Sequence, residues 1–230
     1  MKTLICAVVA ASAGLAAADV YTDAGGDLFD NSFAHLDITS VELTNDADWL
    51  YITVNTAGDL DAVNWGKYGV GIDNGSGGGD NSNAWGRNID WGRNITHWTA
   101  SWADDGGTGV GGEVYEYNAG WNLLGATWNG DSNIAGDDSM HASGTQKWQI
   151  LLADLGVGAG DTIMFDVITT GGGGGDPGVD HLSRSDLATS DWSVQSVAGA
   201  FNAYTIVPVP APGAIALMGL GGLVAARRRR

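Results

Sequence analysis

The chain has 230 residues, with 37 glycines, ten tryptophans, one cysteine and a formal net charge of −17 at pH 7. Such a charge repels the phosphates of DNA and RNA and the headgroups of anionic lipids, so nucleic acid is excluded as a partner. All but three of the acidic residues are aspartates, and aspartate and glycine favour turns over helices. The composition therefore predicts a helix-poor protein with many loops.

A secretory signal peptide is predicted at residues 1–18. Lys2 supplies a positive charge, Leu4 to Ala17 form a short apolar run, and Ala16-Ala17-Ala18 is a small-residue cleavage site. The run is too short to span a bilayer, and a buried N-terminal helix is the alternative. Cleavage would also remove Cys6, the one cysteine, so the mature protein is expected to have neither disulfides nor a thiol nucleophile.

The first strands of the predicted domain, residues 19–207, show an alternating pattern. Leu50, Ile52 and Val54 alternate with polar or aromatic side chains, as in a half-buried strand. Residues 34–44 precede them across the turn sequence Asn45-Asp46-Ala47-Asp48, so the two segments predict a hairpin.

Glycine or aspartate clusters separate nearly all of the remaining strand candidates. No apolar stripe of helical period is present outside the two ends of the chain, and about nine strands predict an all-β fold, a single antiparallel β-sandwich or jelly roll. Long Gly/Asp-rich loops are expected at 73–94, 129–144 and 170–200. The further strand candidates are 68–73, 95–102, 113–117, 121–128, 146–152, 162–169 and 203–207.

An aromatic repeat suggests a carbohydrate-binding surface. Trp85-Gly86-Arg87-Asn88-Ile89 is echoed by Trp91-Gly92-Arg93-Asn94-Ile95, and Trp98 and Trp102 are spaced to share one face of a strand. An exposed indole ring stacks on the apolar face of a pyranose, and neighbouring polar groups bond its hydroxyls. The alternative is that these tryptophans are core residues. The candidate ligand-binding residues are Trp85, Arg87, Trp91, Arg93, Trp98 and Trp102.

Aspartate-rich loops suggest a structural Ca²⁺, and no other cofactor is expected. Asp73 and Asp80 lie around one glycine loop, and Asp137 and Asp138 lie in another. Hard cations prefer such oxygen ligands, but none of these segments has the spacing of an EF-hand loop. Solvated turn residues are therefore the alternative. Further aspartates in such loops are Asp131, Asp176, Asp180 and Asp186.

No residue is predicted to be catalytic. Glu113 and Glu116 are three apart on a predicted strand and should face opposite sides of the sheet, whereas a glycosidase needs two carboxylates facing one cleft. No G-x-S-x-G motif is present, and the histidines are dispersed along the chain. We therefore expect a protein that is not an enzyme, with a secreted glycan hydrolase as the least favoured alternative. The four histidines are His35, His97, His141 and His181.

The last 23 residues combine three features of a membrane-retention element. Prolines are clustered at Pro208, Pro210 and Pro212, an apolar Gly-rich run spans 213–226, and four arginines end the sequence. The run would form about 21 Å of helix, short of a ~30 Å hydrocarbon core. The terminal arginines would stay on the cytoplasmic side. They are Arg227, Arg228, Arg229 and Arg230.

This ending resembles the PEP-CTERM sorting signal that exosortase-type transpeptidases process in Gram-negative bacteria. The resemblance is carried by Pro210-Ala211-Pro212, the apolar run and the arginine cluster, with Ala211 where the family most often has glutamate. It implies export by the Sec machinery, transient anchoring in the inner membrane through the tail alone, and delivery to the cell surface or extracellular space. An ordinary single-pass anchor is the alternative.

A second, generic resemblance concerns the hairpin. Asn45-Asp46-Ala47-Asp48 followed by residues 49–54 is similar to an early hairpin of family-nine carbohydrate-binding modules and related extracellular sandwiches. Together the two resemblances suggest a cell-surface or matrix-associated protein with a structural or interaction role linked to exopolysaccharide, its candidate partner. A carbohydrate-binding module that uses the Trp, Arg and Asn side chains is the alternative.

Overall fold

The computed structural model describes residues 17–63, 65–103 and 109–209. All but the last two residues of the predicted signal peptide lie outside these ranges, and so do the sorting residues Pro210, Ala211, Pro212, Arg227, Arg228, Arg229 and Arg230. Within the described ranges, no helix has the length and apolar character needed to cross a membrane.

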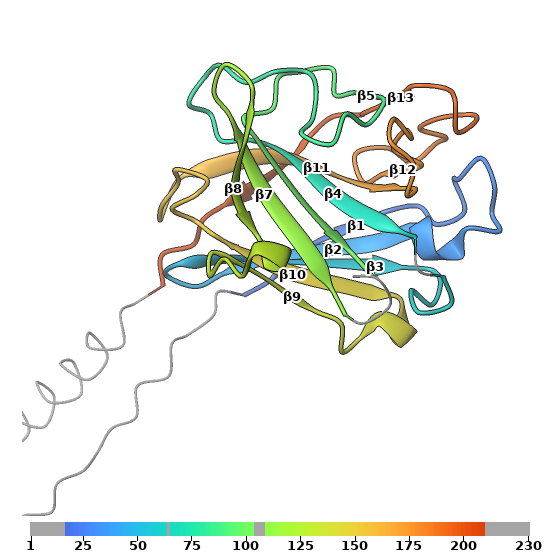
Figure 1. The fold of residues 1–230 in the computed structure, drawn as a ribbon, viewed down its shortest axis with the longest axis horizontal. Helices are drawn as coiled ribbons and strands as arrows, with labels where there is room; N and C mark the ends of the chain where they lie inside the picture. Colours follow the sequence, from blue (N-terminus) through green and yellow to red (C-terminus); the bar gives the residue numbers. More distant parts are fainter. Residues whose placement is uncertain (1–16, 64, 104–108, 210–230) are drawn as a thin grey trace, which may run out of the picture.

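The protein is an all-β antiparallel sandwich, as the sequence predicts (Figure 1). The first sheet has the strand order β1-β2-β3-β10-β9. Its strands are β1 (Asp19–Thr22), β2 (Ile38–Asn45), β3 (Trp49–Thr56), β9 (Ile134–Asp137) and β10 (Thr145–Leu151).

The second sheet has the order β12-β11-β4-β6-β7-β8, and β14 also pairs with β11. Its strands are β4 (Lys67–Asp73), β6 (His97–Trp102), β7 (Gly111–Tyr117), β8 (Trp121–Ala126), β11 (Thr162–Thr170), β12 (Asp180–His181) and β14 (Asn202–Thr205). Apart from these two sheets, β5 (Ile89–Asp90) and β13 (Ser196–Val197) form a short parallel pair. The described helices are single 3₁₀ turns, η1 (Ala34–Leu36), η2 (Thr127–Asn129) and η3 (His141–Ser143).

The predicted hairpin is confirmed by the pairing of β2 with β3. Leu43 pairs with Ile52, and the side chains of β3 alternate between partly exposed and buried along the whole strand. The Asp46 carboxylate accepts the backbone N–H groups of Asp48 and Trp49 at 2.9 and 2.7 Å, which fixes the tight turn. Local pattern and turn chemistry therefore agree here, which is why this element was predictable.

Some predicted boundaries were wrong. Residues 34–36 form η1 rather than the start of β2, because Leu36 turns into a small separate core and the His35 carbonyl accepts the Tyr68 hydroxyl at 2.9 Å. Trp128 lies in η2 beyond the end of β8, and Ile95 makes only an isolated bridge to Asp80. The apolar pattern therefore extends beyond the start of β2 and β6 and beyond the end of β8.

Five strands were not predicted, namely β1, β5, β9, β12 and β13. Four of them lie within the predicted long loops or at their ends, and each has two to four residues. A strand of that length is too short to show a period-2 pattern, so its pairing is decided by the neighbouring strand.

Two hydrophobic cores lie on opposite faces of the second sheet. The main core fills the space between the sheets and includes Val41, Ile52, Val70 and Phe165. A second core lies on the outer face, where the segment between β4 and β6 folds back over the sheet (Figure 1). Its buried members are Ile89, Trp91, Ile95, Trp98, Ala100 and Ile168.

Candidate functional site

The four predicted binding tryptophans come together on the outer face of the second sheet. Trp98 and Trp102 share that face, as predicted. The centroid of the Trp85 ring lies 5.8 Å from the centroid of the Trp98 ring and 5.8 Å from that of the Trp102 ring. Trp91 follows at 5.9 Å from Trp98. The aromatic repeat thus belongs to one contiguous cluster.

Two of these rings are in the core rather than on the surface. Trp91 is 1% exposed and Trp98 is fully buried, so neither offers a ring face to a sugar. Gly69 and Gly71 of β4 make this burial possible. A Cβ at Gly69 would lie 2.2 Å from the Trp98 ring, and a Cβ at Gly71 would lie 3.1 Å from that of Trp91.

The two predicted arginines bind other parts of the chain. Arg87 contacts the carbonyl of Gly173, lies 4.0 Å from the Asp176 carboxylate and stacks at 5.4 Å from the Trp85 ring. Arg93 pairs with Asp73 and lies 5.0 Å from the ring of Phe201. Both guanidinium groups therefore fasten the segment that covers the second core.

The surface that remains open is organised by Glu113 of β7. One carboxylate oxygen accepts the indole N–H of Trp85 at 2.6 Å and the Tyr115 hydroxyl at 2.9 Å. The other accepts the indole N–H of Trp128 at 2.8 Å. We call Trp85, Trp102, Tyr115 and Trp128, together with Glu113, the aromatic platform.

The aromatic platform is partly open to solvent. Trp128 is 58% exposed, and Trp85, Trp102 and Tyr115 are each partly exposed. Burial and the adjacent Glu113 carboxylate raise the pKa of Tyr115, so its hydroxyl stays protonated and donates to Glu113. The rings are thus held in fixed positions before any ligand arrives.

Sequence reasoning missed three members of this surface. The strand pattern includes Trp128 in residues 121–128, no motif singles out Tyr115, and Glu113 is a candidate only for a catalytic acid. The available signal was the spacing of Glu113 and Tyr115, which are two residues apart on β7. This spacing places both side chains on one face of the strand, the face that also carries Trp98 and Trp102.

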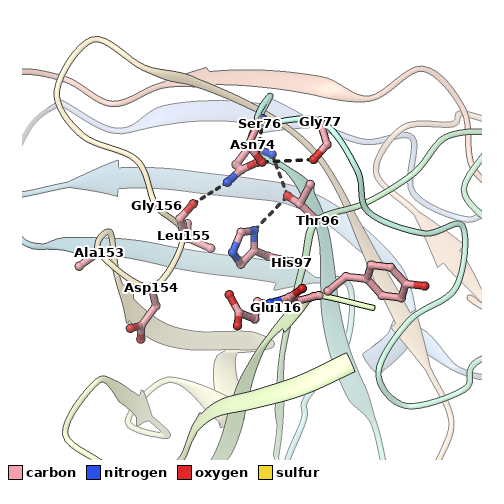
Figure 2. A pocket seen from close by; sticks show the side chains of 12 residues that line it. Asn74, Ser76, Gly77, Thr96, His97, Glu116, Ala153, Asp154, Leu155 and Gly156 are labelled. Carbon is pink, nitrogen blue, oxygen red and sulfur yellow. Dashed lines mark hydrogen bonds between the residues drawn. The ribbon is translucent and has the colours of Figure 1, made fainter. Parts of the chain in front are cut away.

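A polar cavity of about 320 Å³ opens where β4, β6 and β7 meet the loop at 153–156 (Figure 2). His97 and Glu116 occupy paired positions on β6 and β7, and Asp154 lies on the loop side. Glu113 and Glu116 thus face opposite sides of the sheet, as predicted.

The His97 ring in this cavity is neutral at neutral pH. Burial lowers its pKa to about 4, and its Nδ1 lies 3.0 Å from the Thr96 hydroxyl. Nearby, the Asn74 side-chain amide donates to the Leu155 carbonyl at 2.9 Å (Figure 2). The cavity can accept hydrogen bonds from a small polar molecule, but it presents no ring face for stacking a sugar.

The four predicted calcium ligands do not come together. Asp73 is on β4 and pairs with Arg93, Asp80 accepts the Ser82 N–H at 3.1 Å, and Asp137 accepts the Ser139 N–H at 2.9 Å. Asp138 lies beside Asp137 at the end of β9 and is exposed. The carboxylates of Asp73, Asp80 and Asp137 accept backbone N–H groups in turns, which is the alternative interpretation of their loops.

A buried Asp-His-Ser chain joins β11, β12 and β13. Asp166 lies 2.7 Å from His181 Nδ1, and the Ser196 hydroxyl lies 3.0 Å from His181 Nε2. The order of groups matches a nucleophilic triad. All three residues are fully buried, however, and the N–H of Gly178 donates to the Ser196 oxygen at 3.0 Å. No substrate atom can reach this serine in the structure.

The fold and site define an all-β sandwich whose outer face carries a pre-positioned aromatic surface. Comparison with known proteins does not extend this description, since no family model and no curated protein matches the chain.

Proposed function

We propose that this chain is an exported, non-enzymatic protein of the cell surface or extracellular matrix that contacts exopolysaccharide through the aromatic platform. The observation that carries the proposal is the position of Trp128, which is 58% exposed and fixed by a hydrogen bond to Glu113. Large exposed apolar rings in fixed positions are typical of binding surfaces.

The chemistry of the aromatic platform suits a sugar chain. An indole ring offers an apolar face for stacking, and the Glu113 oxygens lie beside it as acceptors for hydroxyl groups. Because Glu113 already restrains Trp85, Tyr115 and Trp128, little side-chain entropy is lost when a ligand binds.

The charge of the protein favours a neutral polysaccharide over an anionic one. Lys2 and the four terminal arginines belong to the proposed export signals, so residues 19–207 carry five basic residues against 27 acids, a net charge of −22. An anionic polymer would be repelled at low ionic strength.

The arrangement of acidic groups supports a role without catalysis. The Glu113 carboxylate lies in the aromatic platform, and Glu116 lines the polar cavity on the other face. A glycosidase needs its two carboxyl groups on either side of one bond. A secreted hydrolase that uses this pair is therefore disfavoured.

Glycan binding is tested by titrating the purified protein with cellohexaose, xylohexaose, mannohexaose and an alginate hexamer while intrinsic tryptophan fluorescence is recorded. We expect a saturable change with a neutral hexamer and a loss of affinity of at least tenfold in Trp128→Ala. Leu187→Ala, which alters a 50% exposed side chain outside the aromatic platform, should leave the affinity unchanged. No saturable response from the folded protein to any of these sugars would reject the glycan-binding role.

Export and sorting form the second part of the proposal. Replacing Arg227, Arg228, Arg229 and Arg230 by alanine in a host that contains an exosortase should change the cell fraction in which the protein accumulates. An unchanged distribution would leave an ordinary secreted protein as the better description.

A further inference from the structure

Three aspartates from distant parts of the chain meet at one end of the sandwich. Asp27 lies in the connection after β1, Asp37 follows η1 and Asp180 begins β12. Each offers a carboxylate oxygen, and these oxygens all lie within 4.8 Å of one another. The group therefore lies where the connection between β1 and β2 meets β12, at the edge of the second sheet.

Asp27 is a partly buried residue whose carboxylate has no partner in another residue. Both of its carboxylate oxygens are shielded from solvent and accept no hydrogen bond from any other residue, although they lie among the other two carboxylates. Asp23, four residues earlier, has one oxygen in the same condition. A buried carboxylate without a donor is unfavourable unless something else neutralises it.

Asp37 and Asp180 are oriented by backbone groups and keep free lone pairs. Asp180 is 3% exposed and accepts the N–H groups of Ile38 at 2.7 Å and His181 at 2.8 Å, one on each oxygen. Both oxygens of Asp37 lie 3.0 Å from the N–H of Gly26. A carboxylate has about four acceptor sites, so each of these groups can still bind a cation.

The surrounding charges make the need for a cation stronger. Arg93 pairs with Asp73, and Arg184, which lines the same surface cavity as Asp23, is paired with Asp186. The charges that act on Asp180 come from other aspartates, Asp23 and Asp27.

We propose that Asp27, Asp37 and Asp180 bind one Ca²⁺ ion, with Asp23 close enough to share in its neutralisation. An all-oxygen ligand set from irregular loops suits Ca²⁺, whereas Zn²⁺ favours nitrogen and sulfur and Mg²⁺ demands regular octahedral geometry. Bound there, the ion fastens the connection between β1 and β2 to β12. Calcium sites of extracellular modules have dissociation constants of about 10⁻⁴ to 10⁻³ M, so an exported protein would be loaded outside the cell.

The test compares the purified protein after EGTA treatment with the same sample in 10 mM CaCl₂ or MgCl₂ at constant ionic strength. We expect one Ca²⁺ per chain by equilibrium dialysis and a rise in melting temperature of roughly 5 to 10 °C, which MgCl₂ does not reproduce. No bound Ca²⁺ and an unchanged melting temperature would overturn the proposal.

Variants locate the ion. Asp27→Asn should abolish the calcium-dependent rise and, in EGTA, should melt no lower than the wild-type protein because a buried charge has been removed. Asp137→Asn is the control, because the sequence also predicts a calcium site in its loop. This variant should keep the full calcium-dependent rise in melting temperature. If Asp27→Asn retained stoichiometric Ca²⁺, the site would be elsewhere. If that variant does not fold, Asp27→Ser replaces it, and the stoichiometry of the wild-type protein still decides whether an ion is bound.

Discussion

The indole N–H of Trp128 donates to the Glu113 carboxylate at 2.8 Å, which joins the 3₁₀ turn after β8 to the middle of β7. The same carboxylate holds Trp85 and Tyr115 through its other oxygen. One acidic side chain therefore fixes three aromatic rings, two of which reach it from outside β7.

Replacing Glu113 should loosen the aromatic platform. In Glu113→Ala, the indole N–H groups of Trp85 and Trp128 lose their acceptor, and we expect stronger acrylamide quenching of the tryptophan fluorescence and an affinity for a bound hexasaccharide reduced about tenfold or more. Glu116→Ala is the matched control, because it alters the same residue type on the same strand but on the opposite face. Equal effects of the two substitutions would contradict the assignment of Glu113 to the binding surface.

A side chain at position 69 should be destabilising. The Cβ of Gly69→Ala would lie 2.2 Å from the Trp98 ring, so the ring must move within a packed core. Overpacking of this kind typically reduces the free energy of unfolding by about 1 to 3 kcal/mol, measurable by urea denaturation. Gly174→Ala, where nothing lies within 4 Å of the added atom, should have little effect. An unaffected Gly69→Ala protein would mean that the second core is loosely packed.

The buried Asp166–His181 pair should stabilise the fold rather than serve catalysis. Asp166→Ala removes the acceptor for the His181 ring, and the backbone N–H of Ser183, 3.0 Å from the other oxygen, also loses its partner. We expect the free energy of unfolding to fall by about 3 to 5 kcal/mol. The pair of Arg184 with the exposed Asp186 provides the comparison, because Asp186→Ala should change stability by less than about 1 kcal/mol.

Ser196→Ala separates the two roles of this chain of hydrogen bonds. A structural serine predicts a loss of about 1 to 3 kcal/mol, because His181 and the Gly178 N–H lose a bonding partner. If Ser196 were a nucleophile, Ser196→Ala would instead lose a hydrolytic activity and keep its stability. That result would contradict the structural role.

The contribution of His97 to stability should fall in mildly acidic solution. Burial lowers its pKa to about 4 in the folded protein, below the ordinary value of 6.5. As the pH falls below 6.5, the unfolded chain gains a proton at this site that the folded chain does not bind until about pH 4. The contribution is a loss of about 2 kcal/mol between pH 7.5 and pH 5.

The His97 contribution is isolated by comparison with His97→Gln, measured by urea unfolding at each pH. The variant should lack this part of the pH dependence, although its stability at pH 7.5 differs. Parallel curves for the two proteins would show that His97 is not the group responsible.

The fold class could be predicted from the amino-acid pattern, because the relevant signals are local. Leu50, Ile52 and Val54 alternate, and Asp46 closes the turn before them, so the β2–β3 hairpin follows from neighbouring residues. The spacing of Trp98 and Trp102 likewise placed both rings on one face. The period of a strand is a property of its own backbone and needs no tertiary information.

Local patterns did not predict which of these side chains reach solvent or which acidic groups meet. Trp91 and Trp98 are buried because glycines in the neighbouring strand leave room for their rings, whereas Trp128 stays exposed beyond the end of β8. Asp27, Asp37 and Asp180 are brought together although more than 140 residues separate the last two. Burial and long-range charge contacts depend on how sheets and loops pack, and the periodicity of the sequence does not predict that packing.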